Sequence, residues 1–330
     1  MLLENIPQTL AQELNIRPEQ AKAAIKLLDE GNTVPFIARY RKEATGELED
    51  EQLRKLEERL AYLRNFVKRQ EEILNKIAEQ GKLTEELQQA IEKTTKLQEL
   101  EDIYLPFKQK KRTRAQKARE KGLEPLSTTI LWQKDTKGSV EKEASKYINL
   151  ELEVNTWQEA MEGARDIIAE IISENANLRQ KLREYIHQHG QISTLMAEDT
   201  SETEEGQRFL MYKEYQEPVK TMPSHRILAI NRGEKLGCLK VTLQLEEDKI
   251  LHLIQKEYLQ GPSIYQQDMK LAIEDSWKRL LSPSLERELR SQLTEMAETQ
   301  AISIFGTNLK QLLLQAPLAG YTVMGLDPGY

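Results

Sequence analysis

A single long apolar seam is the feature that most constrains the fold of this chain. Between Asp50 and Gln80, apolar side chains recur at alternating steps of three and four, which predicts a helix of about 45 Å with one narrow apolar face. Such a seam needs a partner, either another helix of this chain or a second chain. Gln70 at a seam position weakens an oligomeric zipper, so we expect intramolecular packing and a monomer. The seam positions are Leu53, Leu56, Leu60, Leu63, Val67, Gln70, Leu74 and Ile77.

The composition fits long, surface-rich helices better than one compact globule. Apolar residues make up 39% of the 330 residues, charged residues 31% and aromatic residues 6%. The single cysteine, Cys238, excludes an internal disulfide and suits a reducing cytosol. The first residues lack a signal-peptide pattern, and no apolar run approaches membrane-spanning length. We therefore expect a cytoplasmic protein without a membrane partner.

Charge is unevenly distributed along the chain. The net charge of −7 argues against a uniformly basic nucleic-acid coat. The stretch Lys108–Arg119, called the basic segment below, nevertheless holds seven positive side chains and no acid, whereas Glu198–Glu205 holds five acids and no base. The distribution of charge, and not its total, therefore decides which surface could bind an anionic partner.

Helical patterns dominate the chain, with a change of texture after Pro223. Apolar spacing predicts short helices over 4–14 and 18–30, whose arrangement is similar to a helix-turn-helix. The second of them is slightly acidic, which favours a structural helical hairpin over a DNA-reading helix. Further helices are predicted over 157–189 and from Pro283 to Gly306. We predict a mainly α fold, an elongated multi-helix array with a helix-turn-helix-like N-terminus and a minor β element.

The β element and the end of the chain carry the remaining structural predictions. Residues 239–245 alternate as a strand, while residues 224–231 fit either its hairpin partner or a helix, and we favour the helix. Residues 323–326 read as a strand that delivers Asp327 to a Pro-Gly turn. We expect a helical region over 1–200, a mainly helical central region with a short β element over 201–320, and over 321–330 the first strand of a further domain.

The residues offer little support for catalysis. The histidines, such as His187 and His189, lack metal-ligand spacing, and Cys238 has no neighbouring histidine or acid in the sequence. No phosphate-cradling glycine loop occurs in a strand-loop-helix context. We therefore expect no catalytic residue, no metal, no cofactor and no enzyme activity of this chain.

Nucleic-acid binding has better support. Phe107 adjoins the basic segment, and aromatic faces can stack bases while lysine and arginine neutralise phosphates, which suits single strands. A solvated basic loop paired with acidic helices is the alternative and stays open here. A second, shorter basic site lies at Arg39–Lys42. The candidate nucleic-acid-binding residues are Arg39, Arg41, Lys42, Phe107, Lys108, Lys110, Lys111, Arg112, Arg114, Lys117 and Arg119.

Several strings, in order, resemble the Tex family of bacterial RNA-binding transcription accessory proteins. They run from the first helices to the end of the chain, and together they are more specific than any one motif. The strings are TVPFIARYRKE (33–43), LEDIYLPFK (100–108), KAREKGLEPL (117–126), PSHR (223–226), NRGE (231–234), FG with NL (305–309) and GLDPG (325–329).

The resemblance implies a helical scaffold that acts in transcription and at the ribosome. Its ligands would be RNA and, as a second candidate, DNA, and RNA polymerase or the ribosome would be partners. Such proteins continue into a YqgF-type, RNase H-like domain, helix-hairpin-helix elements and an OB-fold RNA-binding domain, all absent here. Asp327 would be the first acidic position of the RNase H-like sheet, but two-metal hydrolysis needs several carboxylates.

Two other functions remain as alternatives. One is a protein-interaction scaffold for RNA polymerase or the ribosome that makes no direct nucleic-acid contact. The other is a truncated RNase H-like nuclease whose catalytic half lies outside this chain.

Overall fold

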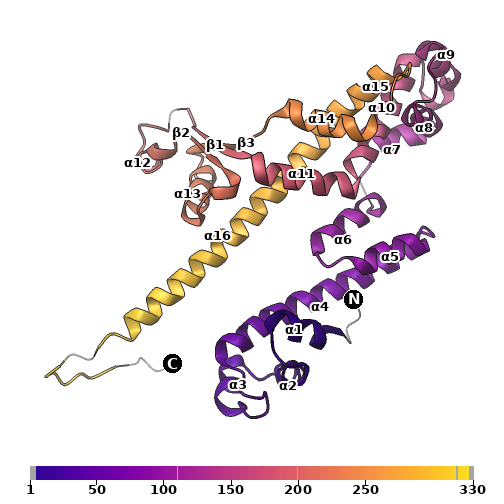
Figure 1. Cartoon of the computed structure of the whole chain (residues 1–330). Coiled ribbons are helices and arrows are strands. Elements are labelled where there is room, and N and C mark those ends of the chain that lie inside the picture. Colours follow the sequence, from indigo (N-terminus) through magenta and orange to yellow (C-terminus); the bar gives the residue numbers. More distant parts are fainter. Residues whose placement is uncertain (1–4, 110, 199, 317–318, 327–330) are drawn as a thin grey trace. The chain divides into compact units, whose positions relative to one another are not determined.

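The chain forms two compact units of mainly helical structure. The computed structural model describes residues 5–109, 111–198, 200–316 and 319–326, and it confirms the predicted mainly α fold (Figure 1). The first unit comprises Met1–Thr113 with Glu174–Arg179, and the second comprises Arg114–Ser173 with Gln180–Tyr330. Within the described residues, no helix is both long enough and apolar enough to cross a membrane.

The first unit is assembled on the long helix that the apolar seam predicts. Its seam side chains are buried by shorter helices of the same unit, except Leu74, which is partly buried, and Gln70 Nε2 donates a hydrogen bond to the Ile91 carbonyl at 2.7 Å. This bond satisfies the polar side chain inside the core, as burial requires. The seam therefore packs within the chain, as predicted. The helices are α1 (Ile6–Leu14), α2 (Pro18–Asp29), α3 (Val34–Tyr40), α4 (Asp50–Glu79), α5 (Glu85–Lys93) and α6 (Leu97–Tyr104), followed by a 3₁₀ turn at Leu105–Phe107.

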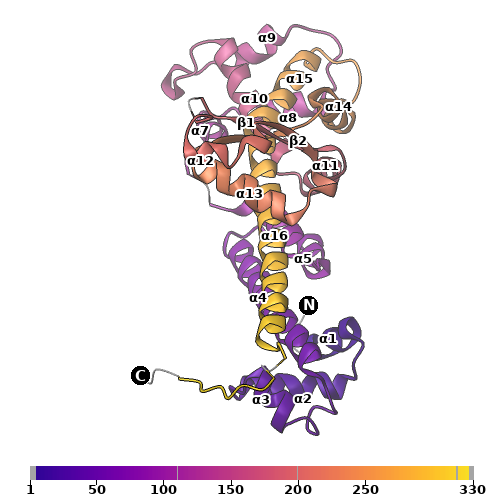
Figure 2. The same cartoon turned by 90° about the vertical axis from the view of Figure 1, so that its left-hand side faces the viewer.

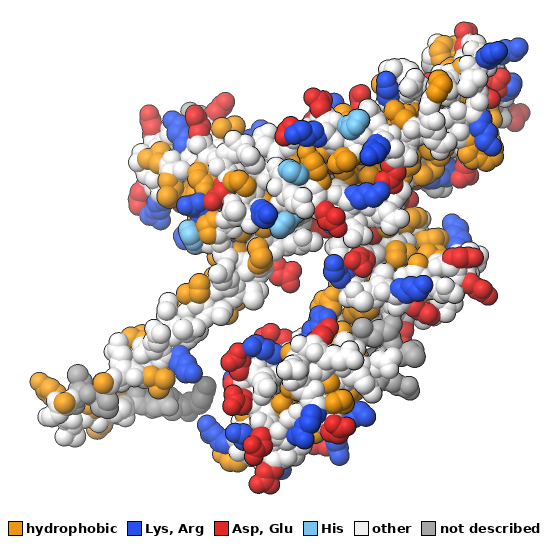
Figure 3. Space-filling view, in the orientation of Figure 1, with side chains coloured by type: hydrophobic (Ala, Val, Ile, Leu, Met, Phe, Trp, Pro, Cys, Tyr) orange, Lys and Arg blue, Asp and Glu red, His pale blue; other side chains and the backbone are white. Residues whose placement is uncertain are grey.

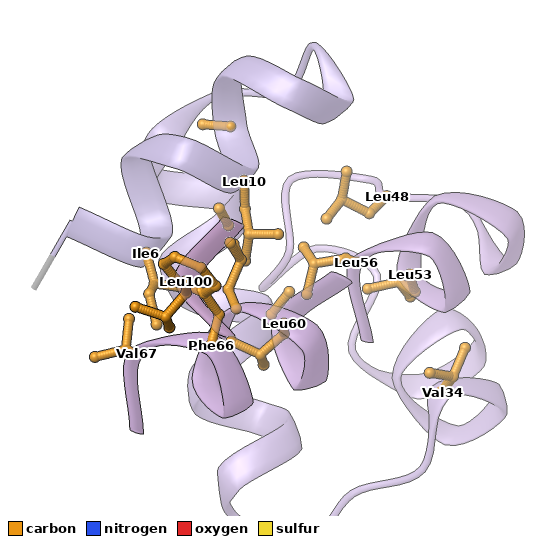
Figure 4. Close-up of a cluster of buried hydrophobic side chains, with 14 of the residues drawn as sticks. Ile6, Leu10, Val34, Leu48, Leu53, Leu56, Leu60, Phe66, Val67 and Leu100 are labelled. Carbon is orange, nitrogen blue, oxygen red and sulfur yellow. The ribbon is translucent and has the colours of Figure 1, made fainter. Parts of the chain in front are cut away.

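The core of the first unit lies where α1 and α6 meet α4. Figure 4 shows Ile6, Leu10, Phe66, Val67 and Leu100 gathered at this point, all at most 3% exposed. Burying apolar side chains of this size contributes about 1.5 to 3 kcal/mol each before conformational entropy is subtracted.

A buried ion pair adds a distant piece of chain to the first unit. Arg179 Nε donates to Asp102 Oδ1 at 2.9 Å, and the two side chains are only 7% and 4% exposed. Arg179 lies near the start of α11 (Ala176–His189), which makes Glu174–Arg179 part of this unit. Removing one partner of such a pair typically costs about 3 to 5 kcal/mol, because the remaining charge stays buried.

The second unit combines helices with one small sheet. β1 lies in the centre and pairs antiparallel with both neighbours, in the order β2-β1-β3, with Ile192 opposite Glu217 and Leu243. Figure 2 shows this sheet with α13 beside it. The strands are β1 (Gln191–Met196), β2 (Glu214–Pro218) and β3 (Leu239–Gln244). The helices that lie wholly in this unit are α7 (Arg114–Glu120), α8 (Glu124–Trp132), α9 (Val140–Ala144), α10 (Trp157–Ser173), α12 (Glu204–Gln207), α13 (Ser224–Lys235), α14 (Glu247–Tyr258), α15 (Gln266–Asp275) and α16 (Ser282–Leu313), with a π-helical turn at Ser276–Leu281 and 3₁₀ turns at Ser145–Tyr147, Leu150–Leu152, Leu210–Tyr212 and Val219–Thr221.

Several sequence predictions are confirmed or corrected in this unit. The strand at 239–245 and the helix at 224–231 are confirmed as β3 and α13. The single helix predicted over 157–189 is wrong, because Asn175 starts a new helix by accepting a hydrogen bond from the Leu178 amide through Oδ1 at 3.0 Å. Gly306 does not end its helix, since one glycine costs only about 1 kcal/mol and helix-forming residues flank it.

The strand predicted at 323–326 is absent from the structure. Residues 321–326 have no regular secondary structure, and Val323, Met324 and Leu326 are 71%, 79% and 86% exposed. A strand needs a hydrogen-bonding neighbour, and none of the described strands pairs with this segment. Asp327 and the Pro-Gly turn after it lie outside the described residues.

Candidate nucleic-acid interface

α3 is a short helix whose two faces have opposite environments. Val34 and Ile37 are buried and pack toward α4, with 3% and 0% exposure. Pro35 lies in the first turn, where its missing N–H leaves no hydrogen bond unmade. The other face therefore points away from the core, and it carries Phe36 and Tyr40 at 37% and 61% exposure.

The exposed face of α3 combines two aromatic rings with three cations. The rings of Phe36 and Tyr40 lie with centroids 5.3 Å apart and an interplanar angle of 46°. The Arg41 guanidinium carbon lies 5.6 Å from the Phe36 centroid, and that of Arg39 lies 6.0 Å from the Tyr40 centroid. Lys42 follows, also exposed, and no carboxylate in the described part of the chain forms an ion pair with these three cations. We call these five residues the α3 surface.

The loop after α3 is held in place by specific hydrogen bonds. Thr45 is fully buried and donates from Oγ1 to the Lys42 carbonyl at 3.0 Å, while Gln20 Nε2 donates to the Gly46 carbonyl at 2.7 Å. Gly46 has a φ of +63°, and an added Cβ would lie 2.9 Å from Arg17 Nη2. The basic end of the α3 surface is therefore fixed against α2.

The sequence predicts that the Phe107 ring is exposed and free to stack on a base, but the structure places this ring partly in the core. It is half-buried in the 3₁₀ turn after α6, packs against the core of the first unit, and accepts a hydrogen bond from Gln80 Nε2 at 2.9 Å through its carbonyl. Among the other predicted residues of this unit, Lys108, Lys111 and Arg112 are exposed, and Lys110 lies outside the described residues.

Arg119 is occupied by an ion pair inside the second unit. Its Nη1 donates to Glu170 Oε2 at 2.5 Å, and its Nε lies 3.8 Å from Glu124 Oε1. The Glu170 side chain is 8% exposed, so this guanidinium compensates a nearly buried carboxylate. Binding a phosphate would compete with that pairing, so Arg119 is a poor candidate for a nucleic-acid contact.

Arg114 and Lys117 line a cleft between α7 and α10, called the α7–α10 cleft. Its volume is about 560 Å³. One wall is basic and the other is acidic, so carboxylates face any anion that enters and weaken its binding. The basic side chains are Arg114, Lys117 and Lys121, and the acidic ones include Glu159, Glu162 and Asp166.

The acidic wall also contains a perturbed carboxyl group. Burial raises the pKa of Asp166 above its ordinary value, and the positive charge of Arg279, at 3.1 Å, offsets part of that rise. Arg114 acts in the same direction as Arg279 at longer range. The charges of this cleft are therefore largely balanced within the second unit, unlike those of the α3 surface.

Phe36 and Tyr40 are candidate interface residues that the sequence did not lead us to predict. Phe107 was predicted instead, because it adjoins the larger number of basic residues. The α3 surface could have been predicted from the i,i+4 spacing of Phe36 and Tyr40, with Arg39 and Arg41 beside them. This spacing places Phe36, Arg39 and Tyr40 on one side of the helix, and Arg41 follows its last residue. No group of three or more His, Cys, Asp or Glu side chains suited to a metal occurs among the described residues.

This fold defines a mainly helical scaffold with an N-terminal helical unit and a second unit that contains a small sheet. The sequence of the chain matches two known protein families: "Tex-like protein N-terminal domain" over residues 4–78, and "Tex central region-like" over residues 135–305. The chain belongs to the Tex family, as the sequence resemblance implies.

The relatives found by sequence comparison agree with this assignment. The uncharacterized protein YdcI of Bacillus subtilis is 44% identical over 328 residues, which cover 98% of this chain and 45% of that protein. The transcriptional accessory protein Tex of Neisseria gonorrhoeae is 43% identical over 332 residues, covering 99% and 43%. The human S1 RNA-binding domain-containing protein 1 is 33% identical over 336 residues, covering 98% and 33%. The chain spans less than half the length of these relatives.

Proposed function

We propose that this chain binds single-stranded RNA through the α3 surface, as a non-catalytic part of a cytoplasmic transcription accessory protein. The observation that carries the proposal is the exposed pair Phe36 and Tyr40 with Arg39 and Arg41 beside their rings. Stacking on an aromatic side chain requires an unstacked base, which single strands supply and duplexes do not. The cations would neutralise the adjoining phosphates.

We propose RNA, and not DNA, as the ligand of the α3 surface. The chain would meet this RNA at RNA polymerase or at the ribosome. The names of two relatives support this choice, since one is called a transcriptional accessory protein and the other an S1 RNA-binding domain-containing protein. Glu19 on the neighbouring helix α2 and Glu30 just after it are exposed, and they would repel the phosphates of a duplex groove. Metal-dependent cleavage of RNA by this chain would contradict the non-catalytic part of the proposal.

The test uses fluorescence anisotropy with a labelled uridine oligonucleotide over a salt series. Neutralising Arg39, Arg41 and Lys42 to glutamine should lower the slope of log affinity against log salt by about 2, since each contact to a single strand contributes about 0.7. Tyr40→Ala should weaken binding about tenfold and leave that slope unchanged, because stacking releases no counterions. Duplex DNA in the same series measures the preference for single strands.

The matched control removes three cations elsewhere on the same unit. Lys22 and Lys26 on α2 and Lys68 on α4 are exposed, and their change to glutamine should leave both affinity and slope near the starting values. If this control lowers the slope as much as the α3 variant, binding is diffuse and the α3 surface is not the site. Affinity that is independent of salt would contradict the proposal outright.

A protein-interaction scaffold is the second candidate, and the last part of α16 favours it. Apolar side chains recur along this part of the helix, where Figure 3 shows them as orange groups at the protein surface. Ile302, Phe305 and Leu313 are 71%, 68% and 74% exposed, which is unusual for a helix in water. Changing these three to serine should abolish capture of RNA polymerase or ribosomes if they are bound here, without affecting RNA affinity.

A further inference from the structure

The exposed face of α13 borders a second cavity, which the α3 surface does not involve. This cavity, called the α12–α13 pocket, has a volume of about 500 Å³ and lies wholly within the second unit. Its size falls in the range of pockets that hold one small organic ligand. Its floor is apolar and consists of Phe209, Leu228, Ala229 and Leu236.

The polar side chains of α13 divide into two sets. Arg226 donates to Glu217 Oε1 at 2.6 Å, Asn231 Nδ2 donates to Thr294 Oγ1 at 2.8 Å, and Glu234 accepts from Arg290 Nη2 at 2.5 Å. These three side chains join α13 to β2 and α16. His225 and Arg232, seven residues apart, instead lie on the pocket side, are exposed, and have no polar side-chain partner in the described part of the chain. The first set of side chains therefore holds α13 in place, whereas His225 and Arg232 are available to contact a ligand.

Close packing beneath the helix keeps the pocket in shape. Gly233 faces the interior, where an added Cβ would lie 2.6 Å from Leu239 Cδ1 and 3.1 Å from Phe209 Cδ1. This lets the Phe209 ring pack close under α13, with 6% of its surface exposed. On the other side, Thr203 Oγ1 caps α12 by accepting from the Gly206 amide at 3.0 Å. The floor and the α12 rim are thus held by ordinary core packing and a helix cap.

The charges at the rim favour an anionic ligand. Arg232 and His225 come from α13, and Arg208 follows α12. Arg208 Nη2 lies 3.0 Å from Glu204 Oε1, but both side chains are well exposed, so this pair holds the guanidinium weakly. Glu205 is the acidic side chain of the lining and can accept a hydrogen bond from an amine or a hydroxyl group.

We propose that the α12–α13 pocket binds one unstacked nucleotide. The base lies on the apolar floor, the phosphate lies between the guanidinium groups of Arg208 and Arg232, and Glu205 accepts from a hydroxyl or exocyclic amine. Guanidinium groups bind phosphate through paired N–H donors, and an apolar floor of this size suits a planar base. The nucleotide is either free or part of bound RNA, and the second source rests on the function proposed above.

The test follows the ring signal of His225 by NMR in the full chain. The chain has four histidines, so the spectrum is sparse, and His225→Gln assigns the signal. Adenosine 5′-monophosphate should shift this signal saturably, whereas inorganic phosphate or adenosine alone should shift it at least tenfold more weakly. The double variant R208Q/R232Q should weaken the nucleotide at least tenfold, and Ala229→Phe, which fills the pocket, should abolish the response.

Lys235→Gln provides the matched control, because Lys235 is an exposed cation of the same helix outside the pocket lining. It should leave the response to the nucleotide unchanged. No shift with the nucleotide, an equal shift with phosphate alone, or an unchanged response in R208Q/R232Q would each overturn the proposal.

The two possible sources of the nucleotide are separated by adding an adenosine oligonucleotide. A His225 response to both ligands places RNA in the pocket, whereas a response to the mononucleotide alone assigns the pocket to a free nucleotide. A response to the oligonucleotide alone would overturn a pocket for one nucleotide. The α3 variants affect anisotropy and not the His225 signal, so failure of one proposal is distinguishable from failure of the other.

Discussion

The α3 surface and the basic segment Lys108–Arg119 are both rich in arginine and lysine, but their surroundings differ. On the α3 surface, Arg39 and Arg41 lie beside exposed aromatic rings without a carboxylate partner in the described part of the chain. In the part of the basic segment that lies in the second unit, Arg119 pairs with Glu170, and Arg114 and Lys117 face the acidic wall of the α7–α10 cleft. The number of charges in a stretch of sequence therefore does not measure the charge that a ligand can reach.

Charge reversal should give the largest difference between the two regions. The double variant R39E/R41E should lower affinity for the uridine oligonucleotide about 100-fold at low salt, because two phosphate contacts become repulsions. The matched variant R114E/K117E should change it less than about threefold. Anisotropy measures both, and circular dichroism checks that each variant stays folded. Equal losses would show that both regions bind RNA and would remove the distinction drawn here.

Arg119→Gln tests the structural role of one predicted binding residue. Glu170 would keep its nearly buried charge without the Arg119 guanidinium, and we expect the free energy of unfolding of the second unit to fall by about 2 kcal/mol. This loss is smaller than that expected for a fully buried ion pair, because Arg119 is 27% exposed. The three tryptophans, Trp132, Trp157 and Trp277, all lie in the second unit, so their fluorescence in urea reports this unit alone. Lys117→Gln is the control and should change the free energy of unfolding by less than about 0.5 kcal/mol. A stable Arg119→Gln protein with weakened RNA binding would restore Arg119 to the interface.

The smallest expected effect is a dependence of stability on pH that comes from the α7–α10 cleft. Burial raises the pKa of Asp166 above its ordinary value of 3.8, so the folded chain binds more protons than the unfolded chain between the two values. Its contribution to stability therefore falls as pH rises through this window and is constant above it. Asp166→Asn should remove this contribution, which we expect to be less than about 1 kcal/mol because the group is only partly buried. Tryptophan fluorescence in urea, repeated from about pH 3.5 to about pH 6, measures the difference. Parallel curves for both proteins would contradict the assignment to Asp166.

The sequence was most informative where one periodic pattern was long. The seam from Leu53 to Ile77 predicts α4 almost to its ends, and the polar Gln70 correctly indicated a partner within the chain. The short strand β2 was missed, because Glu214–Pro218 has little apolar character and is stabilised by its pairing with β1. β1 itself was missed as well, since only Gly190 separates it from α11 and no longer turn in the sequence marks its start. Strand pairing between distant segments is not encoded in local spacing.

The candidate site was predicted less well than the fold. The charge run Lys108–Arg119 is visible in the sequence, but the position of Glu170 next to Arg119 depends on how α7 packs on α10. Likewise, nothing local shows that the Phe107 ring packs against the core while the Phe36 ring does not. The i,i+4 spacing of Phe36 and Tyr40 was readable, but it shows only which side chains share a face, not whether that face is covered.

The ion pair between Asp102 and Arg179 joins two pieces of the first unit that are synthesised at different times. Asp102 leaves the ribosome well before Arg179, with the whole of Arg114–Ser173 made in between. The ion pair can therefore form only after Arg114–Ser173 has been translated. A gene fragment ending at Thr113 would lack this pair for the same reason, and one ending beyond Arg179 would retain it.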